Sequence, residues 1–442
     1  MQQGDDSRLW APGWSASSYW LEGLDAPDVP QADLPREVDV AIVGSGYTGL
    51  NAAIETARGG RSTLVLEAGV PGQGCSSRNG GQISTSIKPG LAALTARHGP
   101  ERAEAIRAEG RRALDWIEER IDAEKIDCDF RRAGRFHAAH TPAAYEDLAR
   151  DAEVLRRTEG IEVEVIPRAE QRRELGTDAY HGAALFPRHA AVNPAKYLHG
   201  LLRSAMKAGA MVLGQTPVLS ITSGPTGHEI RTARGMVRAR DVIVATNGYT
   251  GAATPWQRRR VIPIGSYIIA TEPLAPEVMD HLFPTDRIAS DTCKVVYYYR
   301  ASPDRTRILF GGRVSAAETD TRISGPRLHA DMCRIFPELS GTRISHSWMG
   351  TVAYTFDELA HCGTHEGVHY AMGYCGSGVS MASYLGMRMG QKVLGLAEGQ
   401  TAFDGLPFPT RPFYNGRPWF LPAAVAWYRW RDTRQRERAM AG

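Results

Sequence analysis

The fold of this chain is decided by the stretch Asp39-Val40-Ala41-Ile42-Val43-Gly44-Ser45-Gly46-Tyr47-Thr48-Gly49, which joins an apolar run to a glycine-rich turn. The apolar, β-branched run predicts a buried strand. A helical pattern follows over 50–58, and a second apolar strand over 62–66 ends in Glu67. Strand, glycine turn, helix, strand and acid in this order predict a nucleotide-binding βαβ unit.

Each glycine of the turn has its own part in this prediction. Gly44 permits the sharp turn, Gly46 lets the backbone approach a pyrophosphate, and Gly49 lets the helix pack against the strand. The helix then directs its free N–H groups and its positive dipole end at the phosphates. The alternative is a glycine-rich turn in another kind of α/β domain. The predicted phosphate-binding residues are Gly44, Ser45, Gly46, Tyr47, Thr48 and Gly49.

An acid and a second glycine-rich segment extend the predicted site. The Glu67 carboxylate is placed to accept hydrogen bonds from ribose hydroxyls, which favours FAD or NAD over NADP. The segment that follows is too rich in glycine to be a core element, and its position after the ribose-binding strand favours a cofactor-binding loop over a disordered one. Its predicted contacts are Ala68, Gly74, Cys75, Ser76, Ser77, Arg78, Asn79, Gly80, Gly81 and Gln82.

Length and composition limit the remaining possibilities. The chain has 442 residues, enough for two domains, and a net charge of +3 that gives no reason to expect nucleic acid or a membrane surface as a partner. Its six scattered cysteines form no CxxC pair, which favours reduced thiols and a cytoplasmic location. We expect no secretory signal, no transmembrane helix and no metal site, because the histidines at 361–369 fit no zinc spacing.

The motifs GSGYTGL (44–50) and CSSRNGGQ (75–82), together with Glu67, resemble the D-amino-acid-oxidase-type flavoproteins, which include glycine oxidase and sarcosine oxidase. SYWLE (18–22), SRNGGQ (77–82), ATEPL (270–274) and FGGR (310–313) are most similar to the gamma-glutamylputrescine oxidase group. The resemblance implies an α/β protein with a Rossmann-like FAD-binding domain. It also implies a second domain built on a largely antiparallel sheet with helices.

The resemblance divides the chain into four parts. Residues 1–36 form an aromatic-rich arm that we expect to pack on the body, with contact to a partner subunit as the alternative. The FAD-binding domain is discontinuous and comprises 37–90, 150–255 and 345–405. The substrate domain comprises 91–149 and 256–344. Residues 406–442 form a proline-rich tail that we expect to lie extended over the surface before an aromatic and arginine-rich helix.

The resemblance also implies further FAD contacts. A strand beside the adenine contains Val218, and a strand end at the flavin comprises Ala245, Thr246, Asn247 and Gly248. Sarcosine oxidases carry a flavin-bonded cysteine where Val352 stands here, so noncovalent FAD is expected. A late glycine turn opens a helix whose N-terminus would stabilise the anionic reduced flavin. Many relatives have a histidine where Ser377 stands. The later contacts are Gly350, Gly376, Ser377, Gly378, Val379, Ser380 and Met381.

Residues 261–344 carry the pattern of an antiparallel sheet, with strands predicted over 266–271, 294–299 and 307–313. Tyr267 and Tyr298 fall at positions that can face the flavin, with sheet packing as the alternative. Arg313 requires an anionic partner if it is buried, and we expect it to pair with an anionic group on the substrate. Trp348 is expected to shape the same pocket.

The leading hypothesis is an FAD-dependent amine oxidoreductase. Hydride would pass from a small primary or secondary amine bearing an anionic group to flavin N5, and the imine would hydrolyse. The resemblance suggests gamma-glutamylputrescine or a related ω-amine. An amino acid, an N-methylated amine or an aminophosphonate also fits. We favour O2 as the electron acceptor, with a dehydrogenase as the alternative. Leu309 stands near the position of the lysine that helps to activate oxygen in sarcosine oxidase, and a nearby lysine such as Lys294 could serve instead.

A second enzyme hypothesis and one hypothesis from another class stay open at this point, as does the oligomeric state. A nicotinamide-dependent dehydrogenase uses the same first βαβ unit, but SRNGGQ and the late glycine turn argue against it. A flavin-binding scaffold without turnover would bind FAD that no amine reduces. The sequence offers neither a Ser/His/Asp arrangement nor paired carboxylates for hydrolytic chemistry.

Overall fold

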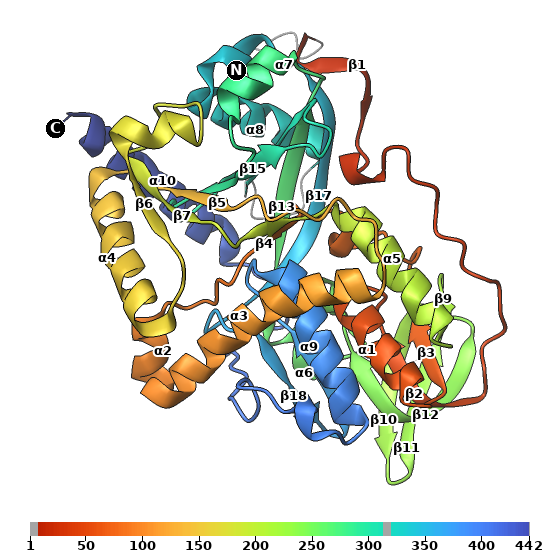
Figure 1. Ribbon diagram of the computed structural model, residues 1–442. Helices are drawn as coiled ribbons and strands as arrows, with labels where there is room; N and C mark the ends of the chain where they lie inside the picture. Colours follow the sequence, from red (N-terminus) through yellow and green to blue (C-terminus); the bar gives the residue numbers. More distant parts are fainter. Residues whose placement is uncertain (1–7, 313–319, 442) are drawn as a thin grey trace.

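Two large β-sheets organise the protein, and the computed structural model describes residues 8–312 and 320–441 (Figure 1). One sheet has eight strands and the other has nine. A small third sheet pairs β4 (Gln82–Ile83) with β8 (Ala190–Ala191). The predicted α/β class, with a Rossmann-like unit and a largely antiparallel second sheet, is confirmed.

The eight-stranded sheet contains the predicted βαβ unit at its centre. Its main path is β10 (Val218–Gly224), β11 (Gly227–Thr232), β12 (Gly235–Val244), β2 (Glu37–Val43), β3 (Thr63–Leu66) and β9 (Met211–Leu213). β2 runs parallel to both β3 and β12, as a nucleotide-binding sheet requires. β19 (Val368–Met372) pairs parallel with β12 and antiparallel with β18 (His361–His365). Helices α1 (Tyr47–Arg58), α5 (Pro194–Lys207) and α9 (Gly378–Val393) contribute buried side chains to the core that packs on β2 and β3.

The nine-stranded sheet forms the second layer. Its order is β1 (Trp10–Ser15), β17 (Ile344–Thr355), β13 (Val261–Thr271), β16 (Ile308–Gly312), β15 (Tyr298–Ala301), β14 (Ile288–Asp291), β5 (Arg135–Ala138), β7 (Gly182–Phe186) and β6 (Glu164–Pro167). Pairing is antiparallel except for β1 with β17 and β14 with β5. The remaining helices are α2 (Leu91–His98), α3 (Pro100–Ala123), α4 (Pro142–Glu159), α6 (Pro255–Arg258), α7 (Pro276–Leu282), α8 (Thr321–Ile335) and α10 (Leu421–Ala441).

Two segments pack differently from the predicted division into domains. Helix α3, expected in the substrate domain, buries Ile106, Leu114 and Ile117 in the same core cluster as Leu50 of α1. Strands β6 and β7, expected in the FAD-binding domain, belong to the nine-stranded sheet. The reason is that apolar periodicity shows that a face is buried without showing which layer covers it.

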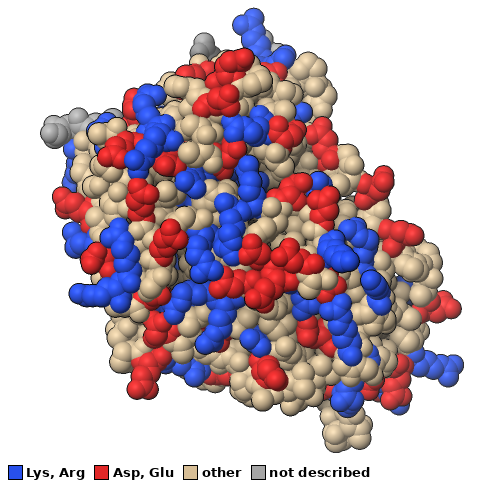
Figure 2. All heavy atoms as spheres, viewed as in Figure 1, with Lys and Arg blue, Asp and Glu red and all other residues tan. Residues whose placement is uncertain are grey.

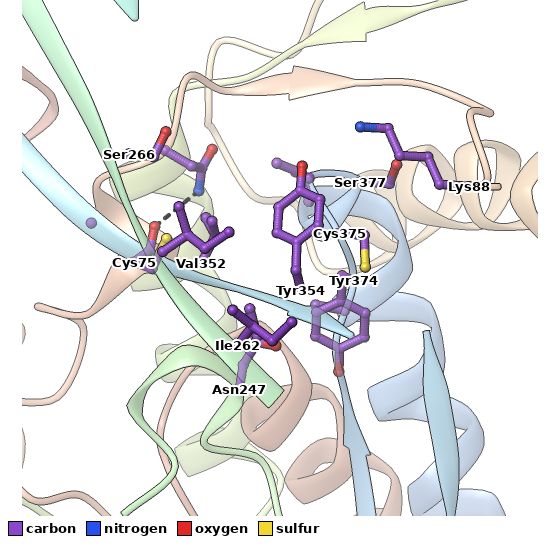
Figure 3. A pocket seen from close by; sticks show the side chains of 18 of the residues that line it. Cys75, Lys88, Asn247, Ile262, Ser266, Val352, Tyr354, Tyr374, Cys375 and Ser377 are labelled. Carbon is purple, nitrogen blue, oxygen red and sulfur yellow. Dashed lines mark hydrogen bonds between the residues drawn. The ribbon is translucent and has the colours of Figure 1, made fainter. Parts of the chain in front are cut away.

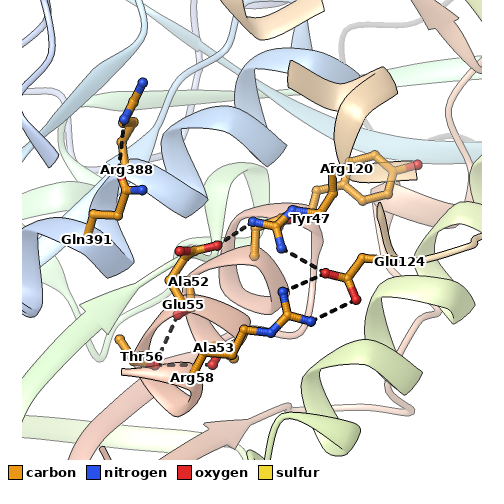
Figure 4. Close-up of polar contacts among 11 residues, drawn as sticks. Tyr47, Ala52, Ala53, Glu55, Thr56, Arg58, Arg120, Glu124, Arg388 and Gln391 are labelled. Carbon is orange, nitrogen blue, oxygen red and sulfur yellow. Dashed lines mark hydrogen bonds and ion pairs between the residues drawn. The ribbon is translucent and has the colours of Figure 1, made fainter. Parts of the chain in front are cut away.

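An ion-pair network ties α3 to α1 (Figure 4). Buried Arg120 donates to Glu55 of α1 and, at 3.1 Å, to Glu124. Arg58 donates to both oxygens of Glu124, at 2.7 and 2.9 Å, and holds the pKa of that carboxyl below its usual range. These contacts fix α1, the helix of the nucleotide-binding unit, against the C-terminal end of α3.

The N-terminal arm packs on the body along one side of the molecule, as Figure 1 shows. Strand β1 pairs with β17, and Trp20 is 1% exposed in a cluster with Trp348 and Leu309. The indole Nε1 of Trp20 donates to the Asn79 carbonyl at 2.7 Å. The arm therefore supports the glycine-rich loop that contains Asn79.

The C-terminal tail ends in α10, which lies against the segment between β14 and β15. Asp432 is 2% exposed, and its carboxylate accepts from the N–H groups of Lys294 and Val295 at 3.1 and 2.9 Å. The strand predicted over 294–299 accordingly begins only at Tyr298. Its earlier N–H groups are taken by carboxylates and so cannot join the sheet.

Charges of both signs are interspersed over the face shown in Figure 2, in agreement with the small net charge of +3. Across residues 8–312 and 320–441, no helix combines the length and the apolar character needed to cross a bilayer.

Candidate active site

One long cavity, with a volume of about 1640 Å³, brings together segments from every part of the chain. Typical small-molecule pockets hold roughly 300–1000 Å³, so this cavity has room for a dinucleotide and a substrate. Twenty-three predicted cofactor contacts line it: Gly44, Ser45, Gly46, Tyr47, Thr48, Glu67, Ala68, Gly74, Cys75, Ser76, Arg78, Asn79, Gly80, Gln82, Val218, Ala245, Thr246, Asn247, Gly350, Gly376, Ser377, Gly378 and Val379. Behind the lining lie Gly49, Ser77, Gly81, Gly248, Ser380 and Met381.

The first glycine turn has the geometry of a phosphate-binding turn. Gly44 has a φ of +106°, which side chains rarely allow. A β-carbon on Gly49 would stand 1.9 Å from the Gly44 carbonyl oxygen, so only glycine fits where α1 meets β2. Helix α1 begins at Tyr47, whose N–H donates to the Ser76 hydroxyl at 3.2 Å, and its N-cap residue Gly46 has no side chain to cap the N–H groups that follow. These next N–H groups of the first turn suit an anion in the cavity.

Glu67 holds this turn against the end of β3. Its carboxylate accepts from the Ser45 N–H at 2.9 Å, from the Ser45 hydroxyl at 2.7 Å and from the Gly69 N–H at 3.1 Å. Val218, which begins the adjoining β10, lines the same end of the cavity. The acid and the apolar strand end stand where an adenosine would lie in a βαβ nucleotide site.

Indole and hydroxyl groups hold the SRNGGQ loop (residues 77–82) by its carbonyl groups. Trp348 Nε1 donates to the Arg78 carbonyl at 2.9 Å, Trp20 Nε1 to that of Asn79, and the Ser18 hydroxyl to that of Ser77 at 3.2 Å. Trp348 itself is 1% exposed and outside the cavity lining. Trp348 therefore supports the loop. We had expected it to shape the substrate pocket, but it does not line the cavity.

The late glycine turn forms the wall opposite the loop. Cys375 and Gly376 both have positive φ, at +51° and +101°. Ser377 precedes α9, does not cap it, and donates its hydroxyl to the Ser86 carbonyl at 2.7 Å. Figure 3 shows Cys75 and Val352 on one side of the cavity and Ser377 and Lys88 on the other. A second uncapped helix N-terminus therefore faces the cavity.

The predicted substrate residues separate in the structure. Tyr298 lines the cavity, where its hydroxyl hydrogen-bonds that of Ser266 at 2.7 Å. Tyr267 is fully buried in the core on the other face of β13, because successive strand residues point to opposite faces. Arg313 lies outside the described residues.

The two positions considered for oxygen activation also separate. Leu309 is 2% exposed in the core beside Trp20, away from the cavity lining. Lys294 lines the cavity near α10. Lys88, which sequence reasoning missed, lines it too, with its ammonium 5.6 Å from the ring centre of Tyr354.

Sequence reasoning also missed a basic group on β5 and β14. Arg135 and His137 line the cavity and share the Ser290 hydroxyl. Burial lowers the pKa of Arg135 to about 10 and that of His137 to about 3, so His137 is neutral near pH 7. The alternation of Arg135 and His137 with the buried Phe136 and Ala138 was the signal available. Nothing local indicated the cavity-lining residues of α10, which are Leu421, Ala424, Val425, Tyr428, Arg431 and Gln435.

Cys75, Cys375 and His361 have surroundings that suit a structural part better than a metal site or a reactive thiol. Burial raises the pKa of the Cys75 and Cys375 thiols to about 12 and about 11, so both are protonated at neutral pH. His361 pairs with Asp357 at 3.0 Å and stacks on Phe408. Within the part of the chain that the structure describes, no three His, Cys, Asp or Glu side chains are grouped to hold a metal ion.

Comparison with known proteins gives one consistent result. The family model described as FAD dependent oxidoreductase (DAO) matches residues 39–392. Gamma-glutamylputrescine oxidoreductase of Escherichia coli K12 is 32% identical over 403 residues, 89% of this chain and 92% of that protein. Probable oxidoreductase OrdL of Haemophilus influenzae is 29% identical, over 90% of this chain and 93% of that protein. Glycine oxidase of Geobacillus kaustophilus shares the fold, with a TM-score of 0.72, 21% identity and coverage of 86% of this chain and 99% of that one.

Proposed function

Because this chain belongs to the DAO family of FAD-dependent oxidoreductases, which act on amines and amino acids, we propose that it oxidises an amine bearing an anionic group. The substrate proposed is gamma-glutamylputrescine or a similar ω-amine. The amine is oxidised to an imine, which water hydrolyses to an aldehyde and ammonia or a smaller amine. Molecular oxygen takes the two electrons and gives hydrogen peroxide.

The observation that carries this proposal is the single cavity with a nucleotide end and a polar end. Two uncapped helix N-termini, a ribose-binding acid and a held glycine loop suit FAD along one part of it. FAD supplies the redox chemistry when bound. The chain's own residues bind and orient the amine and limit the access of water. The neutral thiols of Cys75 and Cys375, together with a valine at position 352 of β17, support noncovalent binding.

Charges at the polar end support an amine that also carries a negative group. Arg135, Lys88 and Arg431 line this end, and Asp147 and Asp151 of α4 line it as well. A substrate with an ammonium group and a carboxylate would meet both signs of charge. The name of the Escherichia coli relative supports the same substrate class.

The proposal is tested by anaerobic reduction of the bound flavin. The panel is gamma-glutamylputrescine, putrescine, glycine, sarcosine and 2-aminoethylphosphonate. We expect gamma-glutamylputrescine to bleach the flavin fastest, and admission of air to restore the colour with one hydrogen peroxide per turnover. Reduction by putrescine alone would contradict the anionic group. If the reduced flavin is reoxidised slowly by air but passes its electrons rapidly to a dye, the enzyme is a dehydrogenase and not an oxidase.

A further inference from the structure

A polar row crosses the cavity face of the nine-stranded sheet. Ser290 of β14 is paired with Tyr298 of β15 on one side and with His137 of β5 on the other. Ser266 of β13 contacts the Tyr298 hydroxyl and pairs with Gly350, at the FAD side of the cavity. The row therefore leads from the cofactor side of the cavity to β5.

Arg135, at the far end of this row, has hydrogen-bonding capacity to spare. Its Nε and Nη2 donate to the Ser290 hydroxyl oxygen at 2.9 and 2.6 Å. A guanidinium has five N–H donors, so three remain without an acceptor among the residues that the structure describes. Within 8–312 and 320–441, no carboxylate pairs with Arg135, and loss of solvent is the cause of its lowered pKa. A cation withdrawn from water without an anion beside it is costly unless a ligand supplies the anion.

His137 adds a second donor at the same place. Because the Ser290 oxygen accepts from Arg135, its O–H is directed to His137 Nδ1, 2.8 Å away. This arrangement assigns the ring proton to Nε2, which makes Nε2 a donor. The neighbouring acid, Asp291, is engaged by the N–H groups of Cys293 and Tyr297. The surroundings of Arg135 thus offer donors to an anion.

We propose that Arg135, supported by Ser290 and His137, binds the carboxylate at the far end of a long ω-amine substrate. This inference deepens the proposed function and rests on it for the identity of the substrate. Ser266 and Ser290 are three strand spacings apart, roughly 14 Å at about 4.8 Å per strand. An α-amino acid, whose amine and carboxylate are attached to one carbon, is too short to reach from the cofactor side to Arg135. A γ-glutamyl amide of a diamine is long enough.

The experiment uses two ligands that have no terminal amine to be oxidised: γ-glutamylbutylamide and its α-carboxamide, which lacks only the negative charge. Binding of each to the FAD-loaded enzyme is measured by calorimetry. We expect the wild type to bind the carboxylate roughly 10- to 100-fold more tightly than the carboxamide, as charge-assisted hydrogen bonds to a guanidinium predict. Arg135→Gln is expected to remove this preference and to leave binding of the carboxamide unchanged.

Two further variants sharpen the result. Arg434→Gln removes the same charge from α10 at an exposed residue outside the cavity lining and is expected to keep the preference. Arg135→Lys keeps the charge but loses the planar fork, so a preference at least about threefold below wild type is expected. If Arg135→Gln does not retain FAD, the inference is tested by Arg135→Lys alone, through the size of its preference for the carboxylate over the carboxamide.

Three outcomes would overturn the inference: equal binding of the two ligands by the wild type, an unchanged preference in both Arg135 variants, or loss of the preference in Arg313→Gln alone. Failure of the proposed function is a separate result. If gamma-glutamylputrescine is not oxidised while the binding preference still depends on Arg135, the anion site stands and the substrate assignment fails.

Discussion

The two ends of the cavity are built in different ways. The nucleotide end consists of backbone: glycine turns, uncapped helix N-termini and strand ends, each contained in a few consecutive residues. The substrate end consists of side chains from strands β5, β13, β14 and β15 and from α10, hundreds of residues apart in the chain. Backbone sites are therefore tied to local sequence, whereas the substrate end depends on sheet register and on buried carboxylates that order its loops.

The largest effect is expected from Gly49→Val at the nucleotide end. The new β-carbon would stand 1.9 Å from the Gly44 oxygen, and backbone on both sides leaves no room to relax. We expect more than about 3 kcal/mol of lost stability and loss of bound FAD. FAD content and thermal unfolding measure both. Gly341→Val is the control, since nothing lies within 4 Å of its added β-carbon and it is outside the cavity lining; equal losses in both variants would contradict the argument.

A pH effect tests the substrate end. Burial raises the pKa of Asp291 from its usual 3.8 to about 7. Between about pH 4 and pH 7 the folded protein thus holds a proton that the unfolded chain has released, so stability falls as the pH rises through this window. We expect a loss of about 3 kcal/mol of stability from this group between pH 4 and pH 7 in the wild type and none in Asp291→Asn. Parallel pH profiles of unfolding for the two proteins would contradict this.

A smaller effect is expected from Glu67→Gln at the nucleotide end. The amide replaces a carboxylate that accepts from Ser45 and Gly69 and would meet ribose hydroxyls. Reconstitution of the apoprotein should show roughly 10-fold weaker FAD binding, about 1.4 kcal/mol. Glu37→Gln on exposed sequence of the same sheet is the matched control. Unchanged affinity in Glu67→Gln would remove this acid from the site.

The smallest effect is expected from Asp432→Ala on α10. Two backbone N–H groups, of Lys294 and Val295, lose their acceptor, which costs about 1 kcal/mol. We expect KM to rise several-fold with FAD content unchanged, and the segment after residue 406 to be cut sooner by protease. Glu437→Ala, on the exposed side of the helix, should change neither. A fall in FAD content would show that the two ends are not independent.

The sequence predicted helices and strands most accurately where local chemistry fixes their ends. Helix α5 begins at Pro194, after an Asn-Pro pair that is a local signal for a helix start, because the Asn193 side chain accepts from the N–H groups of Ala195 and Lys196 at 3.1 and 3.2 Å. The prediction was wrong at 294–297, where Asp432, far away in sequence, accepts from the N–H groups of Lys294 and Val295. Nothing within a short window of sequence could indicate this partner.

By itself the sequence determined the nucleotide-binding unit, the glycine loop and the family, because a turn that only glycine can form is written in consecutive residues. Only the tertiary structure decided that Tyr267 belongs to the core, that Trp348 supports a loop, and that Arg135 and α10 reach the cavity. Strand pairing and helix docking place these side chains, and both depend on contacts between distant parts of the chain.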